Sequence, residues 1–183
     1  MQFVEIETAK FFKDLYSSPK FAWLWLVIRL YVGYEWFIAG WDKLSSPVWI
    51  GDKAGVAVSG FLQGSLNKTG GAHPDVSSWY AWFIQNVAMP NASLFSYLVV
   101  FGEIFVGIAL ILGLFVGIAA AFGGFMNFNY LFAGTVSVNP QLLLLQILLI
   151  LAWKCAGWYG LDRWLLPKLK RSWWESKLLA WKK

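Results

Sequence analysis

The chain has 183 residues, of which 58% are hydrophobic and only 14% are charged, and it contains thirteen tryptophans. This balance is typical of an integral membrane protein and argues against an ordinary soluble domain. The net charge of +5 does not indicate a nucleic-acid partner, because most basic residues flank hydrophobic segments, where they meet the anionic headgroups of membrane lipid. The single cysteine, Cys155, excludes an internal disulfide, and no cluster of Cys or His indicates a metal site.

The N-terminal twenty residues are polar and charged, rather than a basic tip followed by an apolar core. We therefore expect no cleavable signal peptide, and the first spanning helix would act as an uncleaved signal. The stretch from Phe3 to Tyr16 mixes lysines with large apolar side chains, and so does the stretch from Leu165 to Trp181. Both are expected to form amphipathic helices along the inner headgroup layer.

Four apolar segments predict four membrane crossings. A bilayer core of about 30 Å requires a helix of about 20 apolar residues, and segments near this length occupy residues 21–40, 92–112, 115–133 and 140–157. No charged residue occurs from Ile104 to Trp153, and in lipid only helices satisfy every backbone polar group of such a stretch. We predict a single domain, residues 1–183, that is an all-α integral membrane protein built as a four-transmembrane-helix bundle.

The distribution of basic residues predicts the orientation of this bundle. Ten lysines and arginines lie before the first segment or after the fourth, whereas the loop at residues 41–91 has three lysines offset by three aspartates. Basic residues concentrate on the cytoplasmic side of a membrane, so both termini are expected in the cytoplasm and the loop outside the cell membrane. Within the loop, the aromatic stretch from Val76 to Met89 is expected to fold against the outer interface.

Three ionisable residues lie well within the apolar segments: Arg29, Glu35 and Glu103. Each is a candidate catalytic residue, because an ionisable group inside a bilayer is costly unless it is paired or hydrated. Counted at about 1.5 Å per residue, Arg29 and Glu103 lie near the midplane on consecutive helices, and we predict that they pair. The alternative is a purely structural ion pair, which would fix the helix register and add little net stability.

Further polar residues are expected to form a pocket with Glu35 in the outer half of the bundle. The candidates for substrate binding are Asp42, Lys43, Asn127 and Gln146. Asn127 and Asn129 lie about 200° apart on a helix, so they cannot both face the pocket. Asn127 is preferred because it follows the small Gly123-Gly124 face by about one turn, whereas Asp42 and Lys43 would edge the opening.

Short motifs occur in a fixed order along the chain. The first block is Arg29-Leu30, Gly33, Phe37, Ala39-Gly40 and Lys43-Leu44, and the second is Gly102-Glu103, Gly107, Leu110, Leu112 and Gly113-Leu114. Met126, Asn127, Gly134 and Asn139-Pro140 follow, and Gly160-Leu161-Asp162-Arg163 is the last block. In their order and spacing these motifs resemble the DoxX/DoxD family of four-helix membrane proteins, from Arg29 to about Leu169.

The resemblance implies a function coupled to membrane quinone. The family's named activity is thiosulfate:quinone oxidoreductase, in which a DoxD membrane subunit and a small DoxA subunit join two thiosulfates into tetrathionate and pass the electrons to quinone. On this interpretation Arg29 or Lys43 would bind the anionic sulfur substrate, and Glu35, Glu103 and Asp42 would relay protons. Quinone would be the electron acceptor, no metal or haem would be bound, and a DoxA-like or other redox subunit would be the partner.

Three functions stay open at this point. The leading one is a membrane redox protein that passes electrons from a small substrate, such as a sulfur compound, or from a partner protein to quinone. The second is a non-catalytic membrane anchor or assembly partner of a redox complex. The third is a carrier for a small solute, which is supported only by polar groups at the midplane, without broken helices or inverted repeats. The sequence also leaves a homo-oligomer open.

Overall fold

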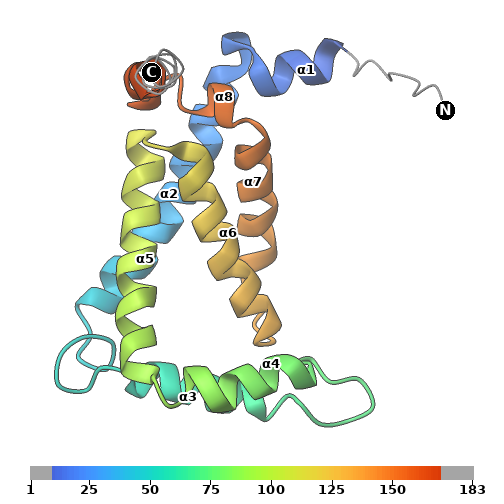
Figure 1. Cartoon of the computed structure of the whole chain (residues 1–183), viewed down its shortest axis with the longest axis vertical. Helices are drawn as coiled ribbons and strands as arrows, with labels where there is room; N and C mark the ends of the chain where they lie inside the picture. The colour runs from blue at the N-terminus through green and yellow to red at the C-terminus, as the bar shows by residue number, and fades with distance from the viewer. Residues whose placement is uncertain (1–9, 170–183) are drawn as a thin grey trace, which may run out of the picture.

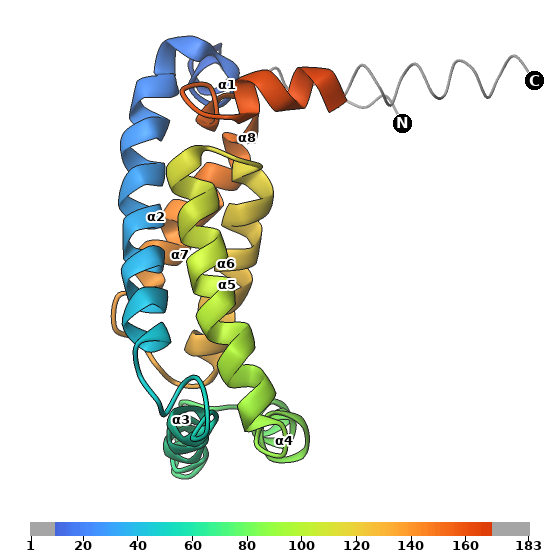
Figure 2. The same cartoon turned by 90° about the vertical axis from the view of Figure 1, so that its left-hand side faces the viewer.

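The computed structural model describes residues 10–169, and within that range the chain is helical without any strand. Four helices lie side by side: α2 (Ala22–Leu44), α5 (Ala92–Leu112), α6 (Val116–Phe132) and α7 (Asn139–Leu151). Contacts join α2 to α5, α5 to α6, and α6 to α7, and α2 also touches α7. The predicted all-α fold is therefore confirmed, and its long helices form a four-helix bundle (Figures 1 and 2).

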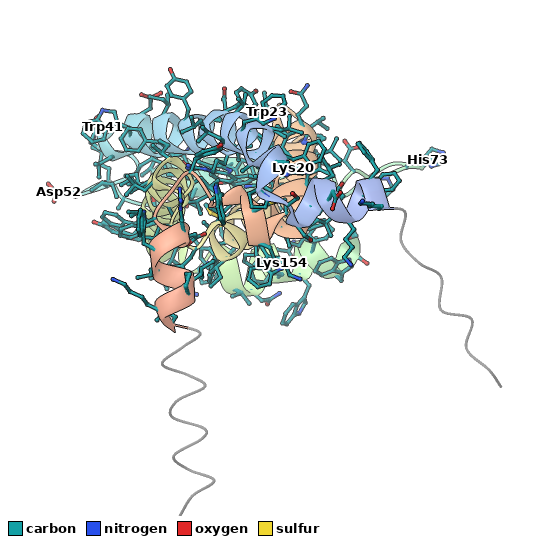
Figure 3. The ribbon with its side chains drawn as sticks, turned by 90° about the horizontal axis from the view of Figure 1, so that it is seen from above. Lys20, Trp23, Trp41, Asp52, His73 and Lys154 are labelled. Carbon is teal, nitrogen blue, oxygen red and sulfur yellow. The ribbon has the colours of Figure 1, made fainter. Side chains whose placement is uncertain are left out.

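Shorter helices close the two ends of the bundle. At one end, called the loop face here, lie α3 (Val56–Leu66) and α4 (Ser78–Phe83), which continues as the π-helix η2 (Ile84–Ala88). At the other end, called the terminal face, lie α1 (Lys10–Ser17), the 3₁₀ helix η1 (Pro19–Phe21), α8 (Trp153–Ala156) and helical residues 162–169. Seen from the terminal face, Asp52 and His73 of the loop project at opposite edges of the molecule (Figure 3).

The helix bounds agree with the predicted segments at most ends. Two differ: α2 continues to Leu44 beyond the predicted end at Gly40, and the fourth segment ends as α7 at Leu151, with α8 following it. Gly40 lies inside α2 rather than at its end, and it is a packing position against α5: a Cβ atom there would lie 2.7 Å from the Ile104 side chain. Gly107 acts similarly, since a Cβ atom there would lie 2.6 Å from the backbone nitrogen of Phe37. Small residues thus let α2 and α5 approach closely, as in helix pairs within membranes.

Two helices are long and apolar enough to cross a membrane. They are the continuous helix Pro19–Leu44, which joins η1 and α2, and α5, whereas α3, α6 and α7 are shorter apolar helices. Large apolar side chains also face outward along α5, namely Leu94, Leu98, Phe101, Phe105, Ile108 and Leu112. Charged and amide side chains are buried inside the same bundle. This distribution, apolar outside and polar within, is that of a membrane protein rather than a soluble bundle.

The loop face has an apolar core of its own. Its buried residues come from α3, α4, η2 and the start of α5, and include Val58, Leu62, Tyr80 and Ile84. The Tyr80 hydroxyl donates to the carbonyl of Asn129 at 3.0 Å, which ties α4 to α6. Burial raises the pKa of Tyr80 to about 12, so this donor is neutral at physiological pH. The aromatic stretch thus packs into the core of the loop face through α4 and η2, whereas its predicted place against the outer membrane interface stays a prediction.

The amphipathic segments predicted at the two ends are described only in part. Residues 10–16 of the first belong to α1, and residues 165–169 of the second belong to the helical turns that cross the terminal face. The remainder of each segment lies outside the described residues.

Candidate functional site

The most polar site inside the bundle is an ion pair between α2 and α5, joined by a tyrosine of α6. Lys43 Nζ lies 2.7 Å from Glu103 Oε2, and the Tyr130 hydroxyl donates to Glu103 Oε1 at 2.9 Å. Both carboxylate oxygens of Glu103 are therefore hydrogen-bonded, although the side chain is only 3% exposed. We call these three side chains the Lys43 cluster.

The helical backbone explains why a residue near the end of α2 reaches the middle of α5. Side chains on an α-helix lean toward its N-terminus, and Lys43 Nζ accordingly donates to the carbonyl of Ala39 at 3.1 Å. Gly40 lies at the same level, directly against Glu103: a Cβ atom at position 40 would lie 3.0 Å from the Glu103 Cβ. The glycine thus allows the carboxylate and the amine to meet.

The Lys43 cluster is covered from the loop face and is still accessible there. Trp49 lies over the amine, with its ring centre 5.3 Å from Lys43 Nζ, and Phe61 of α3 packs edge-on against the Tyr130 ring at 6.2 Å. The Lys43 side chain is nevertheless 22% exposed. An ammonium group has three N–H donors. Within the described residues, Lys43 uses two of them, on the carbonyl of Ala39 and on Glu103, so the third can bind an acceptor on a ligand.

Arg29 does not belong to this cluster, and the predicted Arg29–Glu103 pair is wrong. Its guanidinium donates to three backbone carbonyls: Leu110 at 2.5 Å, Ile111 at 2.7 Å and Tyr159 at 2.8 Å. The last carbonyls of a helix lack partners within the helix and carry the negative end of its dipole, so the C-terminus of α5 is a suitable place for a buried cation. Depth counting failed because it assumed that the first span ends, at Gly40, on the level where α5 begins. Instead, Glu103 lies level with Gly40, about three turns away from Arg29 along α2.

Asp162 is a buried residue for which the sequence analysis predicted no role. Its carboxylate accepts hydrogen bonds from the backbone N–H groups of Phe115, at 2.6 Å, and Val116, at 2.9 Å, where α6 begins. It therefore compensates the positive end of α6, as Arg29 compensates the negative end of α5. The signal in the sequence is the last motif block, in which Asp162 stands two residues after Gly160.

Backbone contacts complete this arrangement around the turn between α5 and α6. The N–H of Leu161 donates to the carbonyl of Leu112, and that of Asp162 donates to the carbonyl of Gly113, at 3.1 and 2.9 Å. We call Arg29, Asp162 and these contacts the terminal latch. Arg29 uses its charge within the fold and does not present it to a substrate.

A third polar site joins α6 to α7. The Asn127 side-chain amide donates to Gln146 Oε1 at 2.6 Å, and neither side chain is exposed. Asn127 faces the interior of the bundle, as expected, whereas Asn129 is only half-buried and bonds with Tyr80. A role of Asn127 in substrate binding stays a prediction. Within residues 10–169, three buried polar atoms at this level have no hydrogen-bond partner: Asn127 Oδ1, Gln146 Nε2 and Trp36 Nε1. Trp36 belongs to the same hydrophobic core as Leu142 and Leu149, which lie on either side of Gln146 in α7.

Comparison with known proteins places the chain in a family. The sequence model of the DoxX family matches residues 24–136, which is more than half of the chain. The chain belongs to the DoxX family. No curated protein and no solved structure matches it.

The DoxX match contains the whole Lys43 cluster, with Arg29 and Asn127, but it ends before Gln146 and Asp162. Thus the partner of Asn127 and the carboxylate of the terminal latch both come from the chain beyond the matched region. Residues 10–169 hold no group of three His, Cys, Asp or Glu side chains that could bind a metal ion.

Glu35 and Asp42 take no part in the three polar sites of this DoxX protein. They lie seven residues apart, on one side of α2, where Asp42 is exposed and Glu35 is half-buried. Neither makes a side-chain hydrogen bond or an ion pair within the described residues. The predicted pocket is therefore divided: Lys43 joins Glu103, Asn127 joins Gln146, and the two acids of α2 flank the bundle. Tyr130, which the sequence analysis missed, stands one turn after Asn127.

Proposed function

We propose that this DoxX protein is a four-span membrane redox protein that passes electrons from a small substrate or a partner protein to quinone at the Lys43 cluster. The observation that carries the proposal is Glu103, a carboxylate in the middle of the most apolar helix, hydrogen-bonded to both Lys43 and Tyr130. A connected carboxylate, amine and phenol can hold and transfer protons. Such a group at membrane depth marks a functional site by default.

The cluster suits acceptors of two kinds. The free N–H of Lys43 can bind an oxyanion, such as a sulfur compound of the thiosulfate class, or a carbonyl oxygen. A carbonyl oxygen of a quinone is an acceptor of the second kind. A bound quinone would supply a two-electron acceptor. Glu103 and Tyr130 would hold the proton that accompanies reduction, and Trp49 would limit the access of water from the loop face.

The proposal includes the topology and partners inferred from the sequence. Four crossings are supported by the antiparallel bundle of α2, α5, α6 and α7 and by the apolar composition of the two shorter helices. The lysines and arginines at the terminal face support termini in the cytoplasm of a bacterial or archaeal cell. A DoxA-like or other redox subunit would deliver electrons.

A second candidate function is a non-catalytic anchor or assembly partner of a redox complex. The observation that favours it is that both oxygens of Glu103 are already satisfied within the protein. A fully satisfied pair can fix the register of α2 against α5 without any reaction.

Exchange of Glu103 for Gln tests the proposal. Glu103→Gln keeps the shape of the side chain and an oxygen acceptor for Lys43, and its amide N–H can donate to the Tyr130 hydroxyl, but it removes the proton chemistry of the carboxylate. We expect quinone-linked turnover with thiosulfate to fall by about 10²-fold or more, the range typical of a lost general acid or base. Turnover would be followed as quinone absorbance in membranes, and bound quinone as mass in the purified protein.

Glu35→Gln is the matched control, because it removes a carboxylate from α2 outside the cluster and should leave turnover unchanged. If Glu103→Gln lowers only thermal stability, and quinone neither copurifies nor is reduced, the anchor function is correct instead.

A further inference from the structure

A hollow of about 390 Å³ opens on the terminal face, between the end of α5 and the turn that leads into helical residues 162–169. It is lined by Leu112, Trp158, Tyr159, Leu161, Arg163 and Trp164. A second hollow, of about 210 Å³, has Leu161 and Trp164 in common with the first and adds Leu114 and Lys168. Both hollows therefore combine leucines, tryptophan and a cation.

The cation of the first hollow is held between two indole rings. The Arg163 guanidinium lies 4.9 Å from the ring centre of Trp158 and 5.5 Å from that of Trp164. Within the described residues it makes no hydrogen bond and no ion pair. Stacking on aromatic rings leaves the N–H groups of a guanidinium free at its edge, in a fork that matches two oxygens of a phosphate.

The apolar part of the hollow continues the outward stripe of α5. Leu112, the last residue of that stripe, is 47% exposed, and Leu161 beside it is 45% exposed. Tryptophan at the same level is typical of the boundary between lipid headgroups and hydrocarbon. A ligand complementary to this surface has a negative phosphate above an alkyl chain.

We propose that this hollow binds an anionic phospholipid, with its phosphate on Arg163 and one acyl chain along Leu112 and Leu161. An anionic lipid is favoured over a zwitterionic one because Lys168 adds a second positive charge beside the hollow, whereas the nearby Asp162 is buried and already hydrogen-bonded. The proposal is independent of the redox function.

Binding there would act on the fold through the terminal latch. The carbonyl of Tyr159 accepts a hydrogen bond from Arg29, and the N–H of Leu161 donates to Leu112. These two lining residues are thus part of the contacts that hold the turn between α5 and α6. A lipid that fills the hollow would stabilise the bundle from its terminal face.

The test compares lipids on the purified full chain in detergent, using thermal unfolding and native mass spectrometry. We expect phosphatidylglycerol to raise the unfolding temperature and to remain bound, whereas phosphatidylcholine and inorganic phosphate do neither. Arg163→Gln should weaken phosphatidylglycerol binding roughly tenfold, the size expected for one charge-assisted hydrogen bond. Lys154→Gln is the matched control, since Lys154 is an exposed cation beside Trp153 on the same face and should bind as the unchanged protein does.

Equal binding of the two lipids, or equal losses in Arg163→Gln and Lys154→Gln, would overturn the proposal. Protection by inorganic phosphate alone would show an anion site without a lipid. If Arg163→Gln fails to fold, Trp164→Ala is tested instead. The Trp164 indole is 67% exposed, so its removal does not open the core. Retention of phosphatidylglycerol should still fall in this variant.

Discussion

Gly123 and Gly124 are neighbours in α6, but only Gly123 faces a polar side chain. A Cβ atom at position 123 would overlap Gln146 Nε2 and lie 3.1 Å from Val106, whereas at position 124 it would lie 3.7 Å from Leu143, an ordinary contact. Gly123 thus provides the space for the buried Asn127–Gln146 hydrogen bond. At the scale of single residues, the glycines of this bundle determine which polar groups can meet.

We predict that Gly123→Ala destabilises the protein by about 1–3 kcal/mol, the usual cost of overpacking a core. Gly124→Ala should be neutral or slightly stabilising, because alanine favours a helix over glycine by about 1 kcal/mol. Thermal unfolding of both variants in one detergent measures the difference.

A double-mutant cycle identifies the cause. In a Gln146→Ala background the same Gly123→Ala change should cost less, since the overlapping amide is gone. An unchanged cost in that background would show that Gln146 is not the obstacle.

Single residues also show what the sequence could and could not provide. Depth within one helix can be counted along the chain, and Arg29, Glu103, Asn127 and Gln146 are all buried as expected. The partner of each side chain depends on how far one helix is shifted along its neighbour. The sequence contains no direct measure of that shift, so Arg29 was assigned to Glu103, and Tyr130 and Asp162 were missed.

At the scale of elements, the terminal latch holds the two ends of the α5–α6 turn by opposite charges. Arg29 meets the carbonyl end of α5, and Asp162 meets the amide end of α6. Helix ends buried in this way need partners, because the first N–H groups and the last carbonyls have none within the helix.

We predict that Arg29→Met and Asp162→Asn are coupled. Each charge keeps its own backbone partners when the other is removed, so each single loss should cost up to about 2 kcal/mol, the range for a partly buried charge at a helix end. Because both charges hold the same turn, the double variant should lose less than the sum. Arg29→Met and Glu103→Leu should instead be additive, because their side chains belong to separate sites. Chemical unfolding of the three single variants and the two double variants gives these energies. Strong coupling between positions 29 and 103 would contradict the latch.

The sequence predicts the starts of the long helices better than their ends or the short helices of the loop face, for physical reasons. The starts of α5 and α7 follow from the beginning of an apolar run and from Asn139-Pro140. The end of α2 was placed too early, because Gly40 resembles a helix end but serves as a packing contact. Within residues 41–91, α3 and α4 were not predicted as helices. Short helices of this kind are stabilised by a shared core, here around Leu62 and Tyr80, more than by their own sequence pattern.

At the scale of the whole molecule, the fold separates two ends with different compositions. The described part of the terminal face carries Lys20, Lys154, Arg163 and Lys168, and Figure 3 shows Lys20 and Lys154 on that side. The loop face instead covers the Lys43 cluster with aromatic side chains. If the terminal face lies in the cytoplasm, as its charge indicates, a substrate approaches Lys43 from outside and a lipid approaches Arg163 from inside.

Labelling of single cysteines tests this arrangement. In a Cys155→Ala background, which removes the one native thiol from a buried position, Ala72→Cys lies in the exposed loop beside His73 and Lys20→Cys lies at the terminal face. We expect an impermeant maleimide to label Ala72→Cys on intact cells and Lys20→Cys only after the membrane is opened, because α2 separates the two positions and the loop has the lower positive charge. Labelling of both positions on intact cells would mean that α2 does not cross the membrane. Labelling of Lys20→Cys alone would reverse the orientation, and with it the side from which the Lys43 cluster is reached.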